Sequence, residues 1–165
     1  MAKKKVNAKD LVHKIEKIAK ERMARENLVS LSEYRKFKNK KEPQNILLIE
    51  DDETMRVAMK RIFESDGHHV IAAADGTELT QLLDNIIIDL IILDVGLPWI
   101  NGFELAELMK SHEDLKNIPL IFVSGRGQSE DVKKGFELGA DDYIKKPFHV
   151  DDIRTAVNAL LELNQ

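Results

Sequence analysis

The sequence predicts an α/β protein whose main domain is a doubly wound, five-stranded parallel sheet, preceded by an α-helical N-terminal extension. From Asn45 onward, short apolar runs rich in β-branched residues alternate with longer segments of helical periodicity. The apolar runs are nearly continuous, which is typical of strands that are buried on both faces. Because strands and helices alternate, we expect βα units with helices on both faces of one parallel sheet.

Five segments carry the strand pattern. They are expected at residues 45–49, 69–73, 90–93, 118–123 and 142–144. Each run ends in acidic residues, glycine or turn residues, which interrupt an extended segment. There is no true internal repeat, because the recurrence is of pattern and not of residues.

The segments between the predicted strands have apolar residues at the three- and four-residue spacing of amphipathic helices. The apolar stripes comprise Met55, Met59, Ile62 and Phe63; Leu79, Leu82 and Leu83; Phe103, Leu105, Ala106, Leu108 and Met109; Val132, Phe136 and Leu138; and Ile153, Val157, Leu160 and Leu161. We expect each stripe to pack on the sheet.

Charge divides the chain into two regions. Residues 1–42 contain 14 Lys and Arg against 6 Asp and Glu, a balance of +8, whereas residues 43–165 contain 11 against 23, a balance of −12. Such a split is typical of two functional regions. We therefore divide the chain into a basic helical extension with its linker, residues 1–42, and a main domain, residues 43–165.

The basic region contains two helical patterns. Leu11, Ile15 and Ile18 form an apolar stripe after Asp10, a suitable N-cap, and Ser30 begins a second, shorter capping pattern. The charge is compatible with a solvated helix, a partner-binding arm, a dimerisation stripe or a nucleic-acid contact. Because no DNA-reading motif accompanies it, a partner-docking or self-docking helix is favoured over nucleic acid. The oligomeric state is left open.

Composition excludes several classes of protein. There is no cysteine, so disulfides, thiolate metal sites and cysteine nucleophiles are excluded, and a reducing compartment is suitable. The neighbouring apolar runs at residues 86–88 and 90–93 are separated by Asp89 and are much shorter than the ~18 residues of a membrane span. Polar residues follow the lysines at 3–5, where a signal peptide has its apolar core. We expect a cytoplasmic protein without a membrane span.

Acidic residues follow the first and third predicted strands. After the first strand stand Glu50, Asp51, Asp52 and Glu53, of which one is enough to cap the next helix. After the third stands Asp94, which taken alone is most often a turn residue. The carboxyl ends of parallel strands line one edge of the sheet. If the strand order is 2-1-3-4-5, as in the flavodoxin-like fold, the two acidic groups are therefore neighbours.

Three carboxylates at one edge require a cation. Glu50, Asp51 and Asp94 repel one another, each pair at about 4 Å costing on the order of 4 kcal/mol at an effective dielectric near 20. Oxygen ligands in an open site favour Mg²⁺. Ser124 ends the fourth strand and Lys146 follows the fifth, so both are expected at the same edge. Taken singly, such a serine is usually a turn former and such a lysine a solvated charge.

Four motifs stand in order along the main domain. They are residues 46–52 (ILLIEDD), 91–98 (IILDVGLP), 121–124 (IFVS) and 139–148 (GADDYIKKPF). With Asn101 and Gly102 after the second motif, they resemble the receiver domain of response regulators along essentially the whole of residues 45–163. The chain is thus identified as a member of the CheY-like superfamily, of the single-domain type with a basic N-terminal extension.

The resemblance implies a signalling phosphoacceptor and not an enzyme. Asp94 is the expected acceptor of a phosphoryl group from a sensor histidine kinase or a phosphotransfer protein. Mg²⁺ is expected to bind Asp51, Asp94 and the backbone carbonyl of Gly96, with Glu50 acting through water. Lys146 is expected to bind the phosphoryl oxygens.

Ser124 and Tyr143 are the switch residues that the resemblance implies. Ser124 is expected to bind a phosphoryl oxygen, and its movement would let Tyr143 turn from an exposed to a buried position. The surface of the fourth helix, fifth strand and fifth helix would then change its binding to a downstream protein target. An ordinary strand aromatic is the alternative for Tyr143.

Two other functions use part of the same chemistry. A small Mg-dependent phosphohydrolase with an aspartate nucleophile needs a general acid two residues later, where this chain has Gly96. A phosphorylation-independent scaffold is the other alternative, and the complete set of chemical residues argues against it. Gly96 also leaves the acceptor open to water, so we expect rapid dephosphorylation unless Arg126 covers the site. The sequence names neither the cognate kinase nor the downstream target.

Overall fold

The computed structural model describes residues 15, 17, 42–83 and 86–164 of the chain. The chain separates into two compact units, Met1–Glu42 and Pro43–Gln165. In the first unit, Ile15 and Lys17 are described, and both are helical and exposed. Residues 1–14, 16 and 18–41, which include the second capping pattern, lie outside the described residues.

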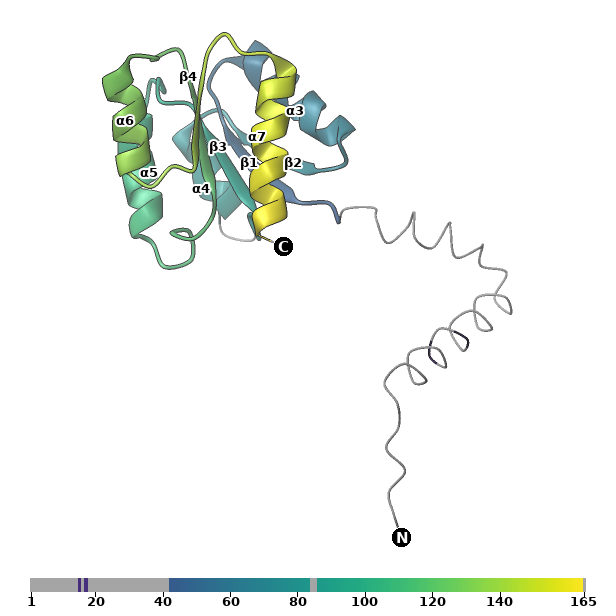
Figure 1. Cartoon of the computed structure of the whole chain (residues 1–165). Helices are drawn as coiled ribbons and strands as arrows, with labels where there is room; N and C mark the ends of the chain where they lie inside the picture. Colours follow the sequence, from purple (N-terminus) through teal and green to yellow (C-terminus); the bar gives the residue numbers. More distant parts are fainter. Residues whose placement is uncertain (1–14, 16, 18–41, 84–85, 165) are drawn as a thin grey trace, which may run out of the picture. The chain divides into compact units, whose positions relative to one another are not determined.

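A five-stranded parallel sheet forms the centre of the second unit (Figure 1). Its strands are β1 (Asn45–Ile49), β2 (His69–Ala73), β3 (Leu90–Leu93), β4 (Leu120–Ser124) and β5 (Asp142–Lys145). They lie in the order β2-β1-β3-β4-β5, and every neighbouring pair is parallel. The predicted fold class and strand order are confirmed.

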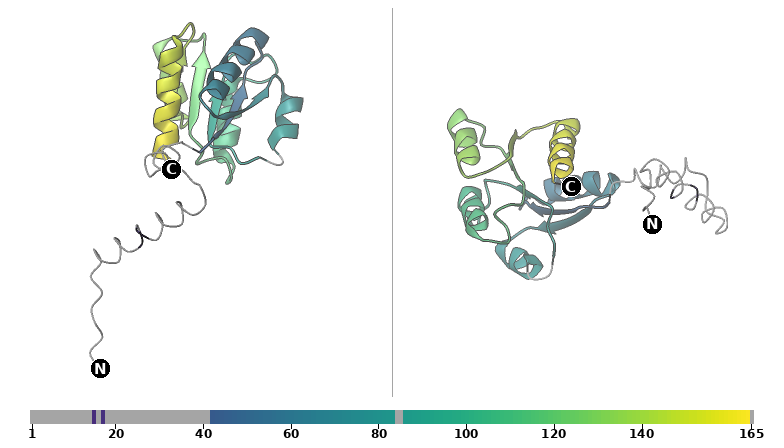
Figure 2. Two further views of the ribbon diagram at one scale, coloured as in Figure 1. Left: turned by 90° about the vertical axis from the view of Figure 1, so that its right-hand side faces the viewer. Right: turned by 60° about the horizontal axis from the view of Figure 1, so that its bottom comes forward.

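Helices cover both faces of this sheet (Figure 2). On one face lie α3 (Glu53–Ser65) and α7 (Val150–Leu163), and on the other α4 (Gly76–Leu83), α5 (Gly102–Ser111) and α6 (Ser129–Glu137). Alternate residues of β1 face opposite layers: Ile46 and Leu48 pack with α3 and α7, and Leu47 and Ile49 with the other three helices. Burial on both faces explains the continuous apolar runs. None of the helices in the described part of the chain has the length and apolar content of a membrane span.

Two strands differ from their predicted bounds. β4 begins at Leu120 and not at Ile118, because Pro119 has no amide hydrogen to donate to the sheet. Both β4 and β5 continue one residue beyond the prediction, to Ser124 and Lys145, which pair with each other. Ser124 therefore lies within a strand, held by the sheet and not by a flexible turn.

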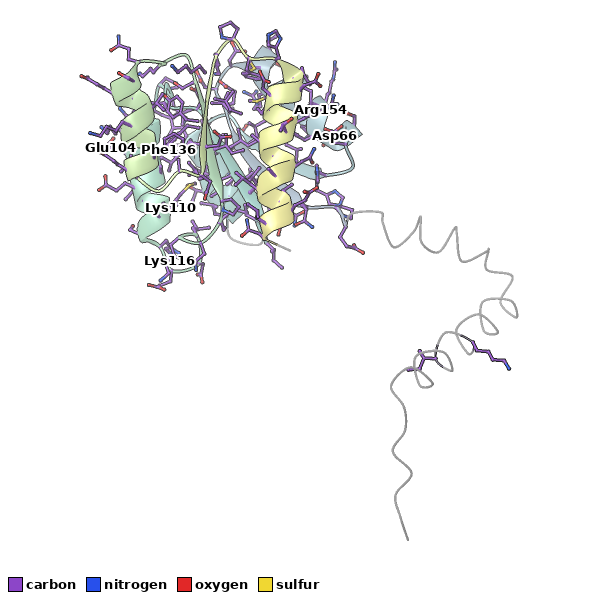
Figure 3. The ribbon with its side chains drawn as sticks, in the orientation of Figure 1. Asp66, Glu104, Lys110, Lys116, Phe136 and Arg154 are labelled. Carbon is purple, nitrogen blue, oxygen red and sulfur yellow. The ribbon has the colours of Figure 1, made fainter. Side chains whose placement is uncertain are left out.

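Two residues of the predicted helical stripes face solvent, and their assignment to the core is wrong. Leu108 of α5 is 61% exposed, and Phe136 of α6, which is labelled in Figure 3, is 47% exposed. Consecutive helical residues point about 100° apart, so each of these two residues points away from the sheet when its neighbour faces it. The neighbours Met109 and Gly135 are the buried ones.

Candidate functional site

Acidic side chains from the ends of two neighbouring strands meet at the carboxyl edge of the sheet. Glu50 and Asp51 follow β1, Asp94 follows β3, and β1 pairs directly with β3. Each of the three carboxylates offers an oxygen atom, and these atoms all lie within 4.8 Å of one another. The structure thus brings together the three acids that the sequence placed at this edge.

The acidic run after β1 is divided between two tasks. Asp52 is the N-cap of α3, since its Oδ1 accepts a hydrogen bond of 2.7 Å from Met55 N. Glu53 lies in the first turn of α3, where a negative charge favours the helix dipole. Glu50 and Asp51 remain for the acidic cluster. Glu50 is 1% exposed, whereas Asp51 is exposed to solvent.

Lys146 reaches the same cluster from the end of β5. It precedes Pro147 in a cis peptide bond. Its Nζ donates to Glu50 Oε2 at 2.6 Å and lies 3.6 Å from Asp94 Oδ2. Lys146, a predicted site residue, therefore lies beside both acids. The sequence did not predict that Glu50 is its nearer partner. The available signal for this ion pair was an acid directly after the first strand and a lysine directly after the last.

Burial and charge change the proton affinities of this pair. Burial raises the pKa of Glu50 above its ordinary value of 4.5, and the charge of Asp94 raises it further. The hydrogen bond from Lys146 lowers the pKa of Glu50, but by less than burial raises it. Burial by itself lowers the pKa of Lys146, but the hydrogen bond to Glu50 and the charge of Asp94 outweigh it. The net pKa of Lys146 is raised above 10.5, so the lysine carries its positive charge at neutral pH.

The backbone after Asp94 is held close to its carboxylate. Gly96 N donates to Asp94 Oδ1 at 3.1 Å, and Gly102 N donates to Val95 O at 2.9 Å. A Cβ atom at Gly102 would overlap the carbonyl oxygen of Asp94, so only glycine allows α5 to begin this close to the site. A Cβ at Gly96 would lie 3.8 Å from Asp94 Oδ1, an ordinary contact. The flank of the Asp94 carboxylate at Gly96 is therefore open.

The backbone of Arg126 links Ser124 to Tyr143. Arg126 N donates to Ser124 Oγ at 3.0 Å, and Tyr143 Oη donates to the Arg126 carbonyl at 2.5 Å. Ser124 is 1% exposed and Tyr143 9%, so both side chains are buried. Burial also raises the pKa of the Tyr143 phenol above 10.0. This link was not predicted, because motif reading compares side chains and both bonds use main-chain atoms.

The Tyr143 ring packs between β4 and α6. Its centroid lies 5.8 Å from that of Phe122, which in turn packs edge-on against Phe103 at 5.2 Å. On the helix side the ring meets the backbone of Gly135. Sequence reasoning missed this residue, and its signal was a glycine inside a helical pattern, where glycine is unfavourable.

The second unit matches a known family. The family described as response regulator receiver domain matches residues 46–158. The aerobic respiration control protein ArcA of Escherichia coli (strain K12) is 39% identical over 117 residues, covering 71% of this chain and 48% of that protein. The transcriptional regulatory protein CpxR of the same strain is 39% identical over 117 residues, covering 70% and 48%. The chain spans about half the length of the curated relatives it matches.

Solved structures give the same result. The non-phosphorylated HemR receiver domain from Leptospira biflexa superposes with a TM-score of 0.68 at 34% identity, covering 74% of this chain and 97% of that one. The Francisella response regulator 1452 receiver domain gives 0.68 at 29% identity, covering 74% and 99%. The chain belongs to the response regulator receiver domain family. Such domains are phosphoacceptors of two-component signalling and interact with histidine kinases or phosphotransfer proteins.

Proposed function

We propose that Asp94 accepts a phosphoryl group from a phosphohistidine on a sensor histidine kinase or a phosphotransfer protein. One observation carries the proposal: Glu50, Asp51, Asp94 and Lys146, which come from the ends of three strands, converge at one edge of the sheet. Membership of the receiver family supports the same assignment. A cysteine-free chain suits a reducing compartment, and we place the exchange in the cytoplasm.

Asp94 acts as the nucleophile. One of its carboxylate oxygens forms a bond to phosphorus while the bond between phosphorus and the donor imidazole nitrogen breaks. The electron pair of the broken bond stays on the imidazole nitrogen, and the product on the receiver is an acyl phosphate. Asp94 is 7% exposed, so the surrounding protein covers most of its surface.

The acidic cluster fits a magnesium ion. Mg²⁺ binds oxygen ligands and takes only one or two protein carboxylates, which suits a site with one exposed acid, Asp51. We assign Asp51, Asp94 and the backbone carbonyl of Gly96 as ligands. Glu50 acts through water, because its Oε2 already accepts from Lys146. When bound, the ion neutralises charge on the phosphoryl oxygens.

Lys146 and Ser124 bind the phosphoryl oxygens after transfer. The Lys146 ammonium has three donors, of which Glu50 uses one, and it lies 3.6 Å from the Asp94 carboxylate. Ser124 Oγ accepts from Arg126 N, and its own hydrogen is the donor that we assign to a phosphoryl oxygen. Charge-assisted bonds of this kind are the strongest hydrogen bonds available in a site of this composition.

Ser124 and Tyr143 form the switch. A movement of Ser124 Oγ toward the phosphoryl group changes its bond with Arg126 N, and the Arg126 carbonyl is the acceptor of the Tyr143 hydroxyl. The position of Tyr143, exposed or buried, is thereby coupled to phosphorylation. The surface of α6, β5 and α7 changes with it and alters binding to a downstream protein target.

The test uses Trp99, the single tryptophan, which follows Asp94 in the β3–α5 loop. Wild type and Asp94→Asn are titrated with Mg²⁺ and then with beryllofluoride, a phosphoryl mimic, while the fluorescence of Trp99 is recorded. The proposal predicts saturable changes in wild type that are lost in Asp94→Asn. Identical responses in the two proteins would remove Asp94 from the site.

A further inference from the structure

Gly135 occupies an unfavourable position for its residue type. It lies inside α6 and is buried, and glycine destabilises a helix interior relative to alanine. No turn explains it: among the described residues, the glycines with positive φ are Gly67 and Gly139. The reason for a glycine at this position is therefore its lack of a side chain.

A side chain at position 135 would collide with the Tyr143 ring. An added Cβ would lie 2.8 Å from Tyr143 Cδ2, 3.2 Å from Tyr143 Cε2 and 3.1 Å from Phe122 Cδ2. Phe122 is fully buried and packs edge-on against Phe103, so it has little freedom to withdraw. Tyr143 lies on β5, the edge strand of the sheet, where a ring can turn toward solvent.

The helix itself is tied to its neighbours. Lys134 Nζ lies 5.0 Å from the centroid of the Phe103 ring, so the residue before Gly135 joins α6 to α5. Val132 and Leu138 of the same segment pack against the buried cluster beneath α6. A displacement of α6 large enough to admit a Cβ would disturb these contacts. Movement of the Tyr143 ring disturbs fewer of them.

We propose that Gly135 is a positioning residue, which admits the Tyr143 ring to its buried place between α6 and β4 and thereby sets the affinity of the site for a phosphoryl group. The inference rests on the switch proposed above, in which the buried position of Tyr143 accompanies phosphorylation. Any side chain at position 135 shifts the ring toward the exposed position.

A thermodynamic cycle tests the steric part. The four proteins are wild type, Gly135→Ala, Tyr143→Ala and the double variant, and the readout is the midpoint of thermal unfolding. We expect Gly135→Ala to lower the midpoint much more in wild type than in the Tyr143→Ala background, where only the 3.1 Å approach to Phe122 remains. Equal changes in both backgrounds overturn the proposal. Lys133→Ala, an exposed change on the same helix, is the control and should act alike in both.

Binding of beryllofluoride in the presence of Mg²⁺ tests the link to the site. Gly135→Ala should weaken the apparent affinity for beryllofluoride about fivefold, because fewer molecules have the Tyr143 ring in its buried position. The same substitution should have no effect when Tyr143 is already alanine. An unchanged affinity in Gly135→Ala overturns the inference. If wild type itself binds no beryllofluoride, the phosphoacceptor proposal fails instead, and the unfolding cycle still decides whether Gly135 positions Tyr143.

Discussion

Lys146 Nζ donates to Glu50 Oε2 across 2.6 Å, although 96 positions separate the two residues in the sequence. Glu50 is 1% exposed at its side chain and Lys146 20%, so the ion pair is largely removed from water. Asp94 Oδ2 lies 3.6 Å from the same ammonium group. Lys146 is thus an internal counter-ion that offsets the repulsion between two buried carboxylates.

Removal of this counter-ion should destabilise the domain. Lys146→Met keeps the alkyl chain but leaves Glu50 buried without its partner, and we expect a loss of about 1–3 kcal/mol in the free energy of unfolding without Mg²⁺. Added Mg²⁺ should reduce the loss, because it supplies positive charge to the same acids. Urea unfolding with a chelator and with Mg²⁺ measures both. The neighbouring Lys145→Met, at an exposed position, is the control, and a loss of equal size there would contradict the account.

The raised pKa of Glu50 predicts a particular pH dependence. Because the folded state holds this proton more tightly than the unfolded chain, the stabilisation is fully present below pH 4.5 and is lost as the pH rises through the raised folded pKa. In the absence of Mg²⁺, the free energy of unfolding of wild type minus that of Glu50→Gln should therefore fall with rising pH across this window. A difference that rises with pH would mean that the pKa is lowered.

The open flank beside Asp94 predicts a short-lived acyl phosphate. A side chain at position 96 fits without collision, since its Cβ would lie 3.8 Å from Asp94 Oδ1. Gly96→Leu should exclude water from the phosphoryl group and lengthen its lifetime, by roughly threefold or more. Phosphate release from the phosphorylated protein measures this lifetime. The same lifetime in wild type and variant, at equal thermal stability, would refute the idea.

Ser124 and Tyr143 should not act independently. Ser124 Oγ accepts a hydrogen bond from Arg126 N, and Tyr143 Oη donates one to the Arg126 carbonyl. Ser124→Ala and Tyr143→Phe should therefore each cost about 1 kcal/mol in the free energy of unfolding. Since both bonds hold one loop, the cost of the double variant should be smaller than the sum. Chemical unfolding of the four proteins gives the coupling. Additivity within ~0.3–0.5 kcal/mol would show that Arg126 does not connect the two side chains.

The sequence predicted the sheet well because its strands are buried on both faces. Such strands are short, continuous apolar runs, and here they alternate with segments of helical periodicity. It predicted the convergence of Glu50, Asp51 and Asp94 once a strand order was assumed, since the order alone makes β1 and β3 neighbours. The helices were predicted less accurately. The periodic pattern does not show which of the neighbours Leu108 and Met109 is buried, because the packing of the helix decides which one faces the sheet.

Long-range and main-chain contacts could not be predicted. The bond between Lys146 and Glu50 depends on where the chain leaves β5 relative to β1, two strands that do not pair with each other. The link through Arg126 uses an amide and a carbonyl, which every residue type carries. Gly135 had a local signal, an unfavourable glycine within a helix, but its reason is the ring of Tyr143 on another element.

Phosphoryl transfer to Asp94 can be tested with a small donor that has a phosphorus–nitrogen bond. Wild type and Asp94→Asn are incubated with phosphoramidate, with Mg²⁺ or with a chelator, and intact mass and peptide masses are recorded. We expect wild type with Mg²⁺ to gain one phosphoryl group on the peptide that contains Asp94, and we expect the chelator and Asp94→Asn to abolish the gain. An equal gain in Asp94→Asn, or none in wild type with Mg²⁺, would contradict it.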